Sequence, residues 1–113
     1  MHKTVLDNRP WGSFKQYTLN ERSTVKILTI NANGKLSKQV HKKRDELWVI
    51  LDKGIIVEID DKKIKAKPGD EFFIPKNTTH RLSSKTGGRV LEISFGKFDE
   101  NDIERIEDVY GRA

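Results

Sequence analysis

An all-β fold, either a sandwich or a barrel, is the fold class that this sequence predicts, because apolar residues alternate with polar ones at a period of two. Turn-forming residues interrupt that alternation repeatedly. Short strands separated by a turn at intervals of about ten residues are typical of sandwiches and barrels. The expected strands are Phe14–Leu19, Val25–Ile30, Leu36–Val40, Glu46–Leu51, Ile55–Ile59, Lys62–Ala66, Glu71–Ile74, His80–Ser83 and Arg89–Phe95.

The turns between these strands are rich in Asn, Asp, Gly and Pro, which tolerate or impose the backbone angles of tight turns. Pro68-Gly69 suits a type II turn, in which proline fixes one φ angle and glycine takes a positive one. In chain order the turn segments are Asn31-Ala32-Asn33-Gly34, Asp52-Lys53-Gly54, Asp60-Asp61, Pro68-Gly69-Asp70, Pro75-Lys76-Asn77 and Thr86-Gly87-Gly88.

The C-terminal segment follows a different pattern. Asp99-Glu100-Asn101 can cap a short helix over Asp102–Asp108, with Ile103 and Ile106 on one face. No repeat, linker or low-complexity segment divides the 113 residues, so we expect one domain, residues 1–113.

Composition excludes several functional classes. The chain has no cysteine, which rules out disulfides, thiol catalysis and cysteine-based zinc sites. Its net charge is +5, but the lysines are scattered among acidic residues, so we expect no role in nucleic-acid binding. No apolar run approaches the roughly 20 residues that cross a bilayer, and no signal peptide is recognisable. We therefore expect no membrane association and a cytoplasmic location.

Two segments contain candidate ligand residues. Gln39 and His41 lie two residues apart on an expected strand and so share a face. A polar turn then returns the chain, which brings Glu46 back beside His41, with Trp48 on the same face as Glu46. His80 opens a later strand. A single histidine on a strand is more often a hydrogen-bonded core residue than a ligand, so spacing alone leaves both a metal site and simple packing open.

Both segments resemble the two sequence motifs of the cupins. Gly69, Pro75 and His80 match the second motif, G-x5-P-x-G-x2-H, with Asn77 in place of its second glycine. The first segment matches its motif at His41 and Glu46, with Gln39 in place of the first histidine. The resemblance implies a double-stranded β-helix, the cupin or jelly-roll barrel. It also implies one divalent metal ion, held by Gln39, His41, Glu46 and His80.

A narrower resemblance covers most of the chain. Arg9-Pro10-Trp11-Gly12, Leu36-Ser37-x-Gln39-x-His41 and Arg105-Ile106-Glu107-Asp108-x-Tyr110-Gly111-Arg112 occur in this order in the type II mannose-6-phosphate isomerases. That family also forms the C-terminal domain of mannose-1-phosphate guanylyltransferases. It usually has histidines where this chain has Lys42, Lys43 and Leu47.

The resemblance implies a metal-dependent isomerase that interconverts mannose 6-phosphate and fructose 6-phosphate. Zn, Mn, Fe, Co and Ni all suit the ligand set. Glu46 is expected to be a ligand, so the proton-transfer group lies elsewhere, with Glu92 as one candidate. Candidate catalytic residues are Arg105, Lys97 and Tyr110. Candidate substrate-binding residues are Arg112, Lys35, Arg44 and Trp48.

Alternatives remain at this point. A dioxygenase-like cupin and a non-catalytic sugar-binding or regulatory cupin share the same motifs. The expected partner is a small phosphorylated sugar. Strand Glu46–Leu51 is apolar on both faces, which requires cover on both sides, either from a second layer or from a homodimer interface. Because cupins commonly dimerise, we expect a homodimer.

Overall fold

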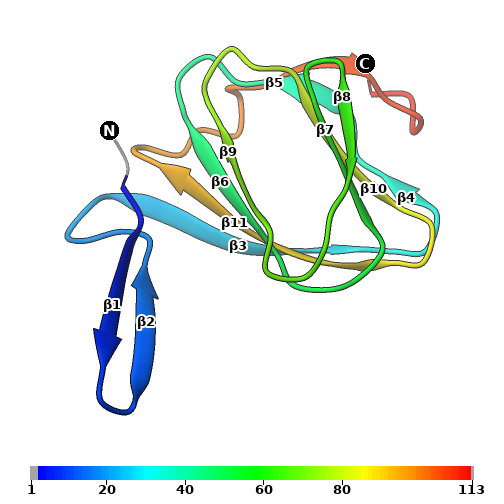
Figure 1. Cartoon of the computed structure of the whole chain (residues 1–113). Helices are drawn as coiled ribbons and strands as arrows, with labels where there is room; N and C mark the ends of the chain where they lie inside the picture. The colour runs from blue at the N-terminus through cyan, green and yellow to red at the C-terminus, as the bar shows by residue number, and fades with distance from the viewer. Residues whose placement is uncertain (1–2, 113) are drawn as a thin grey trace.

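The computed structural model describes residues 3–112, and within that range the regular elements are strands, with no helix. Figure 1 shows their arrangement. The strands are β1 (Val5–Arg9), β2 (Gly12–Gln16), β3 (Ser23–Ile30), β4 (Gly34–Lys35), β5 (Lys38–Val40), β6 (Glu46–Ile50), β7 (Ile55–Ile59), β8 (Lys62–Lys65), β9 (Glu71–Ile74), β10 (His80–Ser84), β11 (Gly88–Phe95) and β12 (Glu104–Glu107).

Two antiparallel sheets form the body of the molecule. The six-stranded sheet has the order β12-β5-β10-β7-β8, with β4 also paired to β10, and the four-stranded sheet has the order β3-β11-β6-β9. The main core lies between them, because it takes residues from both sheets, such as Trp48 and Val90 from one and Val57 and Leu82 from the other. The expected all-β jelly roll is confirmed, with its two sheets not joined into a closed barrel.

Strand β6 is buried along its whole length, as its two apolar faces require. Trp48 and Ile50 point into the main core. Leu47 and Val49 belong instead to a second cluster with Ile93 and other residues on the outer side of the four-stranded sheet. The sheet therefore has apolar side chains on both of its faces.

Several tight turns use the left-handed backbone region. Gly69 has a φ of 90°, as the expected type II turn requires. Asn77, which replaces the second glycine of the cupin motif, has a φ of 65°. Asparagine tolerates this region better than most residues do. The turn that leads to His80 is therefore kept without the glycine.

The predicted helix over Asp102–Asp108 is wrong. Residues Glu104–Glu107 form β12, which pairs antiparallel with β5 at the edge of the six-stranded sheet. The expected cap instead builds a turn, because the Asn101 N–H donates to Asp99 Oδ1 at 2.9 Å and the Asp102 N–H donates to the Asp99 carbonyl at 3.0 Å. The backbone groups of β5 supply hydrogen bonds that override a short helix with weak local preference.

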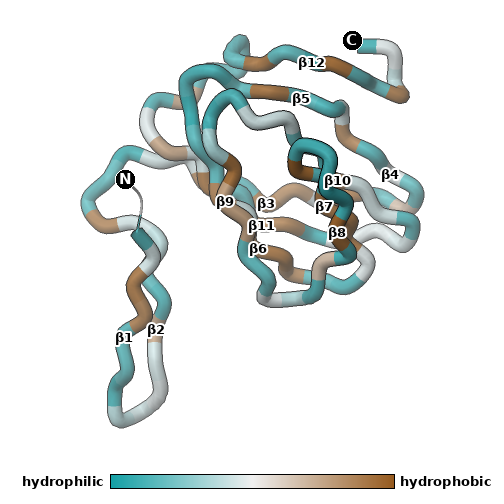
Figure 2. The backbone as a smooth tube through the Cα atoms, turned by 45° about the horizontal axis from the view of Figure 1, so that its top comes forward, coloured by the Kyte–Doolittle hydropathy of each residue, from teal (hydrophilic) through white to brown (hydrophobic). Residues whose placement is uncertain are grey.

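The N-terminal hairpin was also not predicted. Strands β1 and β2 form a separate two-stranded sheet, joined by a turn at Pro10-Trp11. The expected strand Phe14–Leu19 is placed too late, since β2 ends at Gln16. The hairpin projects away from the two sheets in Figures 1 and 2.

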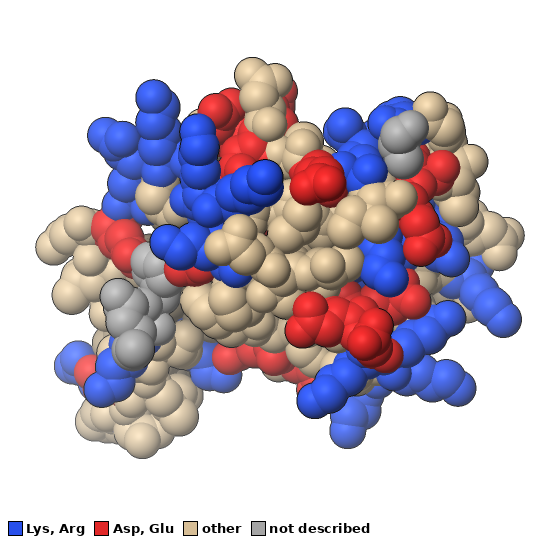
Figure 3. Space-filling view, turned by 90° about the horizontal axis from the view of Figure 1, so that it is seen from above, with Lys and Arg blue, Asp and Glu red and all other residues tan. Residues whose placement is uncertain are grey.

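The surface is rich in ions of both signs. On the face drawn in Figure 3, groups of basic and acidic side chains are interspersed, with uncharged residues between many of them. Among residues 3–112 there is no helix long and apolar enough to span a bilayer.

Candidate metal centre

A cavity of about 650 Å³ opens between the two sheets. Strands of both sheets line it, together with the segment that leads into β12. Of the residues predicted from sequence, those that line the cavity are Gln39, His41, Arg44, Trp48, His80, Glu92 and Arg105.

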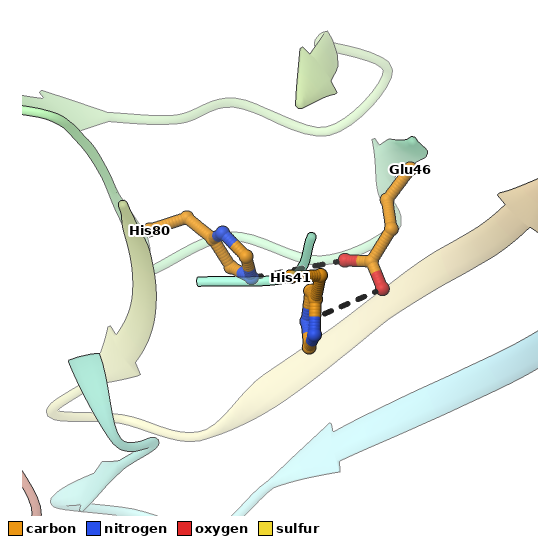
Figure 4. Close-up of side chains that lie close together, drawn as sticks. All are labelled: His41, Glu46 and His80. Carbon is orange, nitrogen blue, oxygen red and sulfur yellow. Dashed lines mark ion pairs between the residues drawn. The ribbon is translucent and has the colours of Figure 1, made fainter. Parts of the chain in front are cut away.

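Three side chains converge at this cavity, as Figure 4 shows: His41, Glu46 and His80. His41 Nε2 lies 3.6 Å from Glu46 Oε2, and His80 Nε2 lies 3.9 Å from Glu46 Oε1. One ligand atom from each residue lies within 4.8 Å of the others. All three side chains are buried, and Glu46 is only 1% exposed.

The fold places these residues from two sheets. His80 begins β10 and pairs in register with Gln39 of β5. Glu46 begins β6 in the four-stranded sheet. His41 directly follows β5, and the polar turn after it returns the chain to Glu46, as the sequence predicted.

Both imidazoles are oriented by backbone carbonyls. His41 Nδ1 lies 2.6 Å from the Asp102 carbonyl oxygen, and His80 Nδ1 lies 2.9 Å from that of Thr78. Each Nδ1–H donates to its carbonyl, which leaves the Nε2 lone pair directed toward Glu46. Burial lowers the pKa of His80, although the Thr78 carbonyl and the Glu46 carboxylate act in the opposite direction. The neutral ring is the form that binds a metal.

The carboxylate of Glu46 is incompletely satisfied. Its Oε1 is buried and makes no hydrogen bond within the described part of the chain. Such an oxygen carries a large desolvation cost unless a cation or a donor reaches it. An unpartnered carboxylate oxygen beside the Nε2 atoms of His41 and His80 is a donor set that fits a first-row divalent cation.

Gln39 lies next to this triad, across from His80 on the neighbouring strand. Its Nε2 donates to Ser37 Oγ at 3.3 Å, and its side chain lines the same cavity. Gln39 therefore stays the candidate for the fourth ligand of the predicted set.

Arg44 is more closely involved in the site than the sequence indicated. Its Nε donates to Glu46 Oε2 at 2.9 Å, and its Nη2 lies 3.3 Å from His41 Nε2. Nη1 donates to the Asp99 carbonyl, and the guanidinium lies 4.4 Å from the centre of the Phe98 ring. The guanidinium is the counter-charge of the buried Glu46 carboxylate.

Glu92 provides a second carboxyl group in the cavity. Burial, and then the nearby charge of Glu46, raise its pKa to about 7. Its cross-strand neighbours are Lys26 on β3 and Trp48 on β6. Trp48 acts in the opposite direction and lowers the pKa of Glu92, because its indole N–H favours the charged carboxylate. This N–H is buried, but within the described residues it makes no hydrogen bond of regular geometry.

Three further cations line the cavity: Lys26, Arg81 and Arg105. Arg81 is fixed by the Leu36 carbonyl, to which its Nε donates at 2.8 Å. The Nε of Arg105 is buried and has no hydrogen-bond partner among the described residues. This group is therefore free to bind an anionic ligand in the cavity.

Other predicted site residues lie outside the cavity. The Lys35 backbone N–H donates to the Tyr110 hydroxyl at 3.3 Å, and Arg112 Nε pairs with Asp108 at 2.6 Å. Lys97 is exposed and does not line the cavity. Trp11, which belongs to the first of the family motifs, lies at the hairpin turn and is 74% exposed, so it neither lines the cavity nor packs in the core. The structure does not bring these residues to the candidate metal centre.

Sequence reasoning missed Lys26 and Arg81 and gave Glu92 little weight. For Lys26 and Glu92, the alternation of apolar and polar residues along their strands contained a signal. Lys26 precedes the inward-facing Leu28, and Glu92 follows the inward-facing Val90, both at a spacing of two. A charged residue at an inward position of an apolar strand indicates a polar cavity rather than a packed core.

Two antiparallel sheets that enclose a His–Glu–His group define a cupin. A solved cupin protein from Bacteroides fragilis agrees with this fold, with a TM-score of 0.61 and 23% identity over 72% of each chain. The family model described as "Mannose-6-phosphate isomerase C-terminal" matches residues 1–108, and the chain belongs to this family. The resemblance read from the motifs is thereby confirmed.

Curated relatives carry the same domain in longer proteins. Alginate biosynthesis protein AlgA of Pseudomonas aeruginosa is 36% identical over an alignment of 108 positions, which covers 93% of this chain and 22% of that protein. Mannose-1-phosphate guanylyltransferase ManC of Salmonella typhimurium is 33% identical over an alignment of 116 positions, which covers 100% of this chain and 24% of that protein. The chain spans under a quarter of the length of these relatives.

Proposed function

We propose that this protein is a metal-dependent sugar-phosphate isomerase that interconverts mannose 6-phosphate and fructose 6-phosphate. The observation that carries the proposal is the donor set itself. The unpartnered Glu46 oxygen and the Nε2 atoms of His41 and His80 meet in a cavity that also contains cations and a second carboxyl group. The family to which the chain belongs supports the choice of substrate.

His41, Glu46 and His80 would hold the divalent ion, with Gln39 as the fourth ligand. When bound, such an ion polarises a carbonyl and a neighbouring hydroxyl of the open-chain sugar as a Lewis acid. Zn, Mn, Fe, Co and Ni remain suitable, because the set combines imidazole nitrogen with carboxylate and amide oxygen.

Proton transfer in this proposal belongs to Glu92. Its pKa of about 7 lets one carboxyl group both accept and donate a proton near neutral pH. Lys26 lies opposite Glu92 on β3 and stabilises its charged form. Lys97 and Tyr110 receive no role in proton transfer, because they lie outside the cavity lining.

Binding of the phosphate is assigned to Arg105, supported by Arg81 and Lys26. Guanidinium groups bind phosphate oxygens through paired N–H donors. Arg105 offers a buried Nε without a partner, and Trp48 forms part of the apolar wall beside the site. Arg112 and Lys35 lie elsewhere and receive no role in the cavity.

The three residues that replace histidines of the family, Lys42, Lys43 and Leu47, lie away from the cavity. Leu47 packs in the outer cluster of the four-stranded sheet, on the face opposite the cavity. Lys42 and Lys43 are exposed and line a separate hollow. These replacements therefore remove no group from the cavity that holds His41, Glu46 and His80.

A non-catalytic sugar-phosphate-binding cupin is the second candidate. It is favoured by Arg44, whose guanidinium neutralises Glu46 and lies 3.3 Å from His41 Nε2. We retain the homodimer and the cytoplasmic location as predictions from the sequence.

The test is an isomerase assay on chelator-treated protein, with Mn, Fe(II), Co, Ni or Zn added back singly. Formation of fructose 6-phosphate with at least one metal is expected. The substitutions His41→Ala, His80→Ala and Glu92→Gln should each reduce turnover at least about 100-fold. Glu104→Gln, on the exposed side of β12, should leave turnover unchanged. Absence of turnover with every metal, combined with calorimetric binding of mannose 6-phosphate, would establish the non-catalytic candidate.

A further inference from the structure

A connecting segment crosses from one sheet to the other beside the candidate metal centre. Strand β11 of the four-stranded sheet ends at Phe95, and β12 of the six-stranded sheet begins at Glu104. Residues 96–103, here called the strap, join the two, and they follow β11 in Figure 1. The members of the strap that line the cavity are Phe98, Glu100, Asn101 and Ile103. The proposed function gives none of these four residues a role.

Contacts with the body of the molecule fix the strap on both sides of its middle. Before the middle, the Phe98 ring has cations over it, with Lys26 Nζ at 3.9 Å from the ring centre and the Arg44 guanidinium at 4.4 Å. After the middle, the Asp102 carbonyl accepts from His41 Nδ1 at 2.6 Å. The residues between these two contacts are therefore held in place at the cavity.

The middle of the strap is a tight turn. The Asp102 N–H donates to the Asp99 carbonyl at 3.0 Å, which makes Glu100 and Asn101 the two central residues of the turn. The Asp99 carboxylate also accepts from the Asn101 N–H at 2.9 Å. Hydrogen bonds inside the strap thus fix the backbone of the turn, and the side chains of Glu100 and Asn101 line the cavity.

The side chains of Glu100 and Asn101 have hydrogen-bonding capacity that the chain does not use. Within residues 3–112 neither side chain makes a hydrogen bond or an ion pair. Arg44 and Arg81, in contrast, are bonded to a carboxylate and to a backbone carbonyl. An amide both donates and accepts, and a carboxylate accepts. These two groups therefore suit hydroxyls, which also donate and accept, better than they suit a phosphate.

We propose that Glu100 and Asn101 are specificity-determining residues that bind the hydroxyl groups of the sugar, while Arg105 binds the phosphate. This inference rests on the proposed function for the phosphate and adds the groups that select a sugar phosphate over other phosphate esters. A carboxylate repels a phosphate, so Glu100 also favours one orientation of the ligand. An ester without hydroxyls displaces water from both side chains and returns no hydrogen bond to them.

The test compares two six-carbon phosphate monoesters by calorimetric titration with Mn present. Mannitol 6-phosphate has hydroxyls along its chain and no carbonyl, so it cannot be isomerised, whereas hexyl phosphate has no hydroxyls. The double substitution Glu100→Ala and Asn101→Ala should raise the Kd for mannitol 6-phosphate at least about tenfold and should not weaken binding of hexyl phosphate. Lys97→Ala, at an exposed position of the same strap outside the cavity lining, is the matched control and should change neither Kd.

A single substitution separates the charge of Glu100 from its hydrogen bonds. Glu100→Gln keeps a hydrogen-bonding group of the same size but removes the negative charge. Inorganic phosphate should therefore bind at least about twofold more tightly to this variant than to wild type at low salt, and the difference should shrink as salt is added. Unchanged or weaker binding of phosphate would contradict the orienting role of Glu100.

The remaining outcomes separate this inference from the proposed function. An equal loss of affinity for both esters in the double variant would show that the strap only shapes the cavity, and would overturn the inference. An unchanged Kd for mannitol 6-phosphate, or no binding of it to wild type, would also overturn the inference. Because mannitol 6-phosphate is not converted, the isomerase assay decides the activity separately. A selective loss of mannitol 6-phosphate binding, with no turnover of mannose 6-phosphate by wild type, would support the inference and overturn the isomerase.

Discussion

The lone pair of His41 Nε2 has two possible uses, and only one can be realised at a time. In this structure Arg44 Nη2 lies 3.3 Å from it. Because His41 Nδ1 is engaged with the Asp102 carbonyl, Nε2 is the atom left for a metal. A metal ion must therefore displace the Arg44 guanidinium from His41 before it can bind there.

Replacing Arg44 by Met is expected to strengthen metal binding. A hydrogen bond to a charged group contributes about 1.5 kcal/mol or more, so its removal should lower the Kd for Zn or Mn about tenfold. Calorimetric titration of chelator-treated protein measures this. Arg89→Met, at an exposed pair with Asp52, is the matched control and should not change the Kd. Weaker binding by the Arg44 variant would mean that Arg44 positions Glu46 for the metal instead.

The same substitution should destabilise the metal-free protein. Without Arg44 the buried Glu46 carboxylate loses its counter-charge. The loss of one partner of a buried ion pair costs about 3 kcal/mol or more. Urea denaturation with chelator present should show this decrease, and added metal should reverse most of it. An unchanged stability in chelator would contradict the assigned role of Arg44.

Glu92 should make the stability of the metal-free protein depend on pH. Its pKa is raised from 4.5 to about 7 by burial and by Glu46, so the folded chain holds this proton where the unfolded chain has released it. The free energy of unfolding therefore falls as pH rises from about 4.5 through 7. The free energy of unfolding of Glu92→Gln, relative to that of wild type, should therefore be higher at pH 8 than at pH 5. The contribution of His80 is common to both proteins and cancels in this comparison.

At the scale of elements, the segment before β12 connects the candidate metal centre to the edge of the sheet. The Asp102 carboxylate accepts from the backbone N–H groups of Lys42 and Lys43 at 2.9 and 3.0 Å. Burial acts to raise the pKa of Asp102, but these two donors hold it below its usual 3.8. The Asp102 carbonyl also orients His41, so one residue fixes both the turn and the ligand.

Replacing Asp102 by Ala should cost on the order of 1–2 kcal/mol, because two backbone donors lose a charged acceptor. Because a lowered pKa adds stability above the unfolded value, the difference from wild type should be full at pH 7 and shrink as pH falls below 3.8. Urea denaturation at pH 7 and pH 3 measures it. Asp61→Ala, at an exposed turn position, is the control and should change stability by less than about 0.5 kcal/mol.

The strands of the two large sheets could be predicted from apolar alternation and turn residues, because each strand buries one face or both at regular spacing. The C-terminal strand could not be predicted in this way. Glu104–Glu107 pairs with β5, which is far away in the sequence, and its local sequence favours a helix cap. The convergence of His41, Glu46 and His80 could be predicted by motif. Arg44 as their counter-charge could not, because its position depends on Phe98 and Asp99 in a distant segment.

At the scale of the whole molecule, the candidate ligands connect the two sheets. His41 and His80 belong to the six-stranded side, whereas Glu46 begins a strand of the four-stranded sheet. A metal ion bound by all three would tie the sheets together only in the folded chain. Ligand binding of this kind stabilises a protein by mass action, by about 2.7 kcal/mol when the free metal is a hundred times its Kd.

The melting temperature should therefore rise by several degrees when Zn or Mn is added to chelator-treated protein, since about 1 kcal/mol shifts a domain of this size by roughly 4 °C or more. Mg should give a smaller shift, because it prefers oxygen ligands to imidazole. The double substitution His41→Ala and His80→Ala removes both nitrogen ligands and should abolish the Zn shift. Differential scanning calorimetry measures all three cases. An equal shift in the doubly substituted protein would place the bound metal elsewhere on the molecule and leave the two sheets unconnected by it.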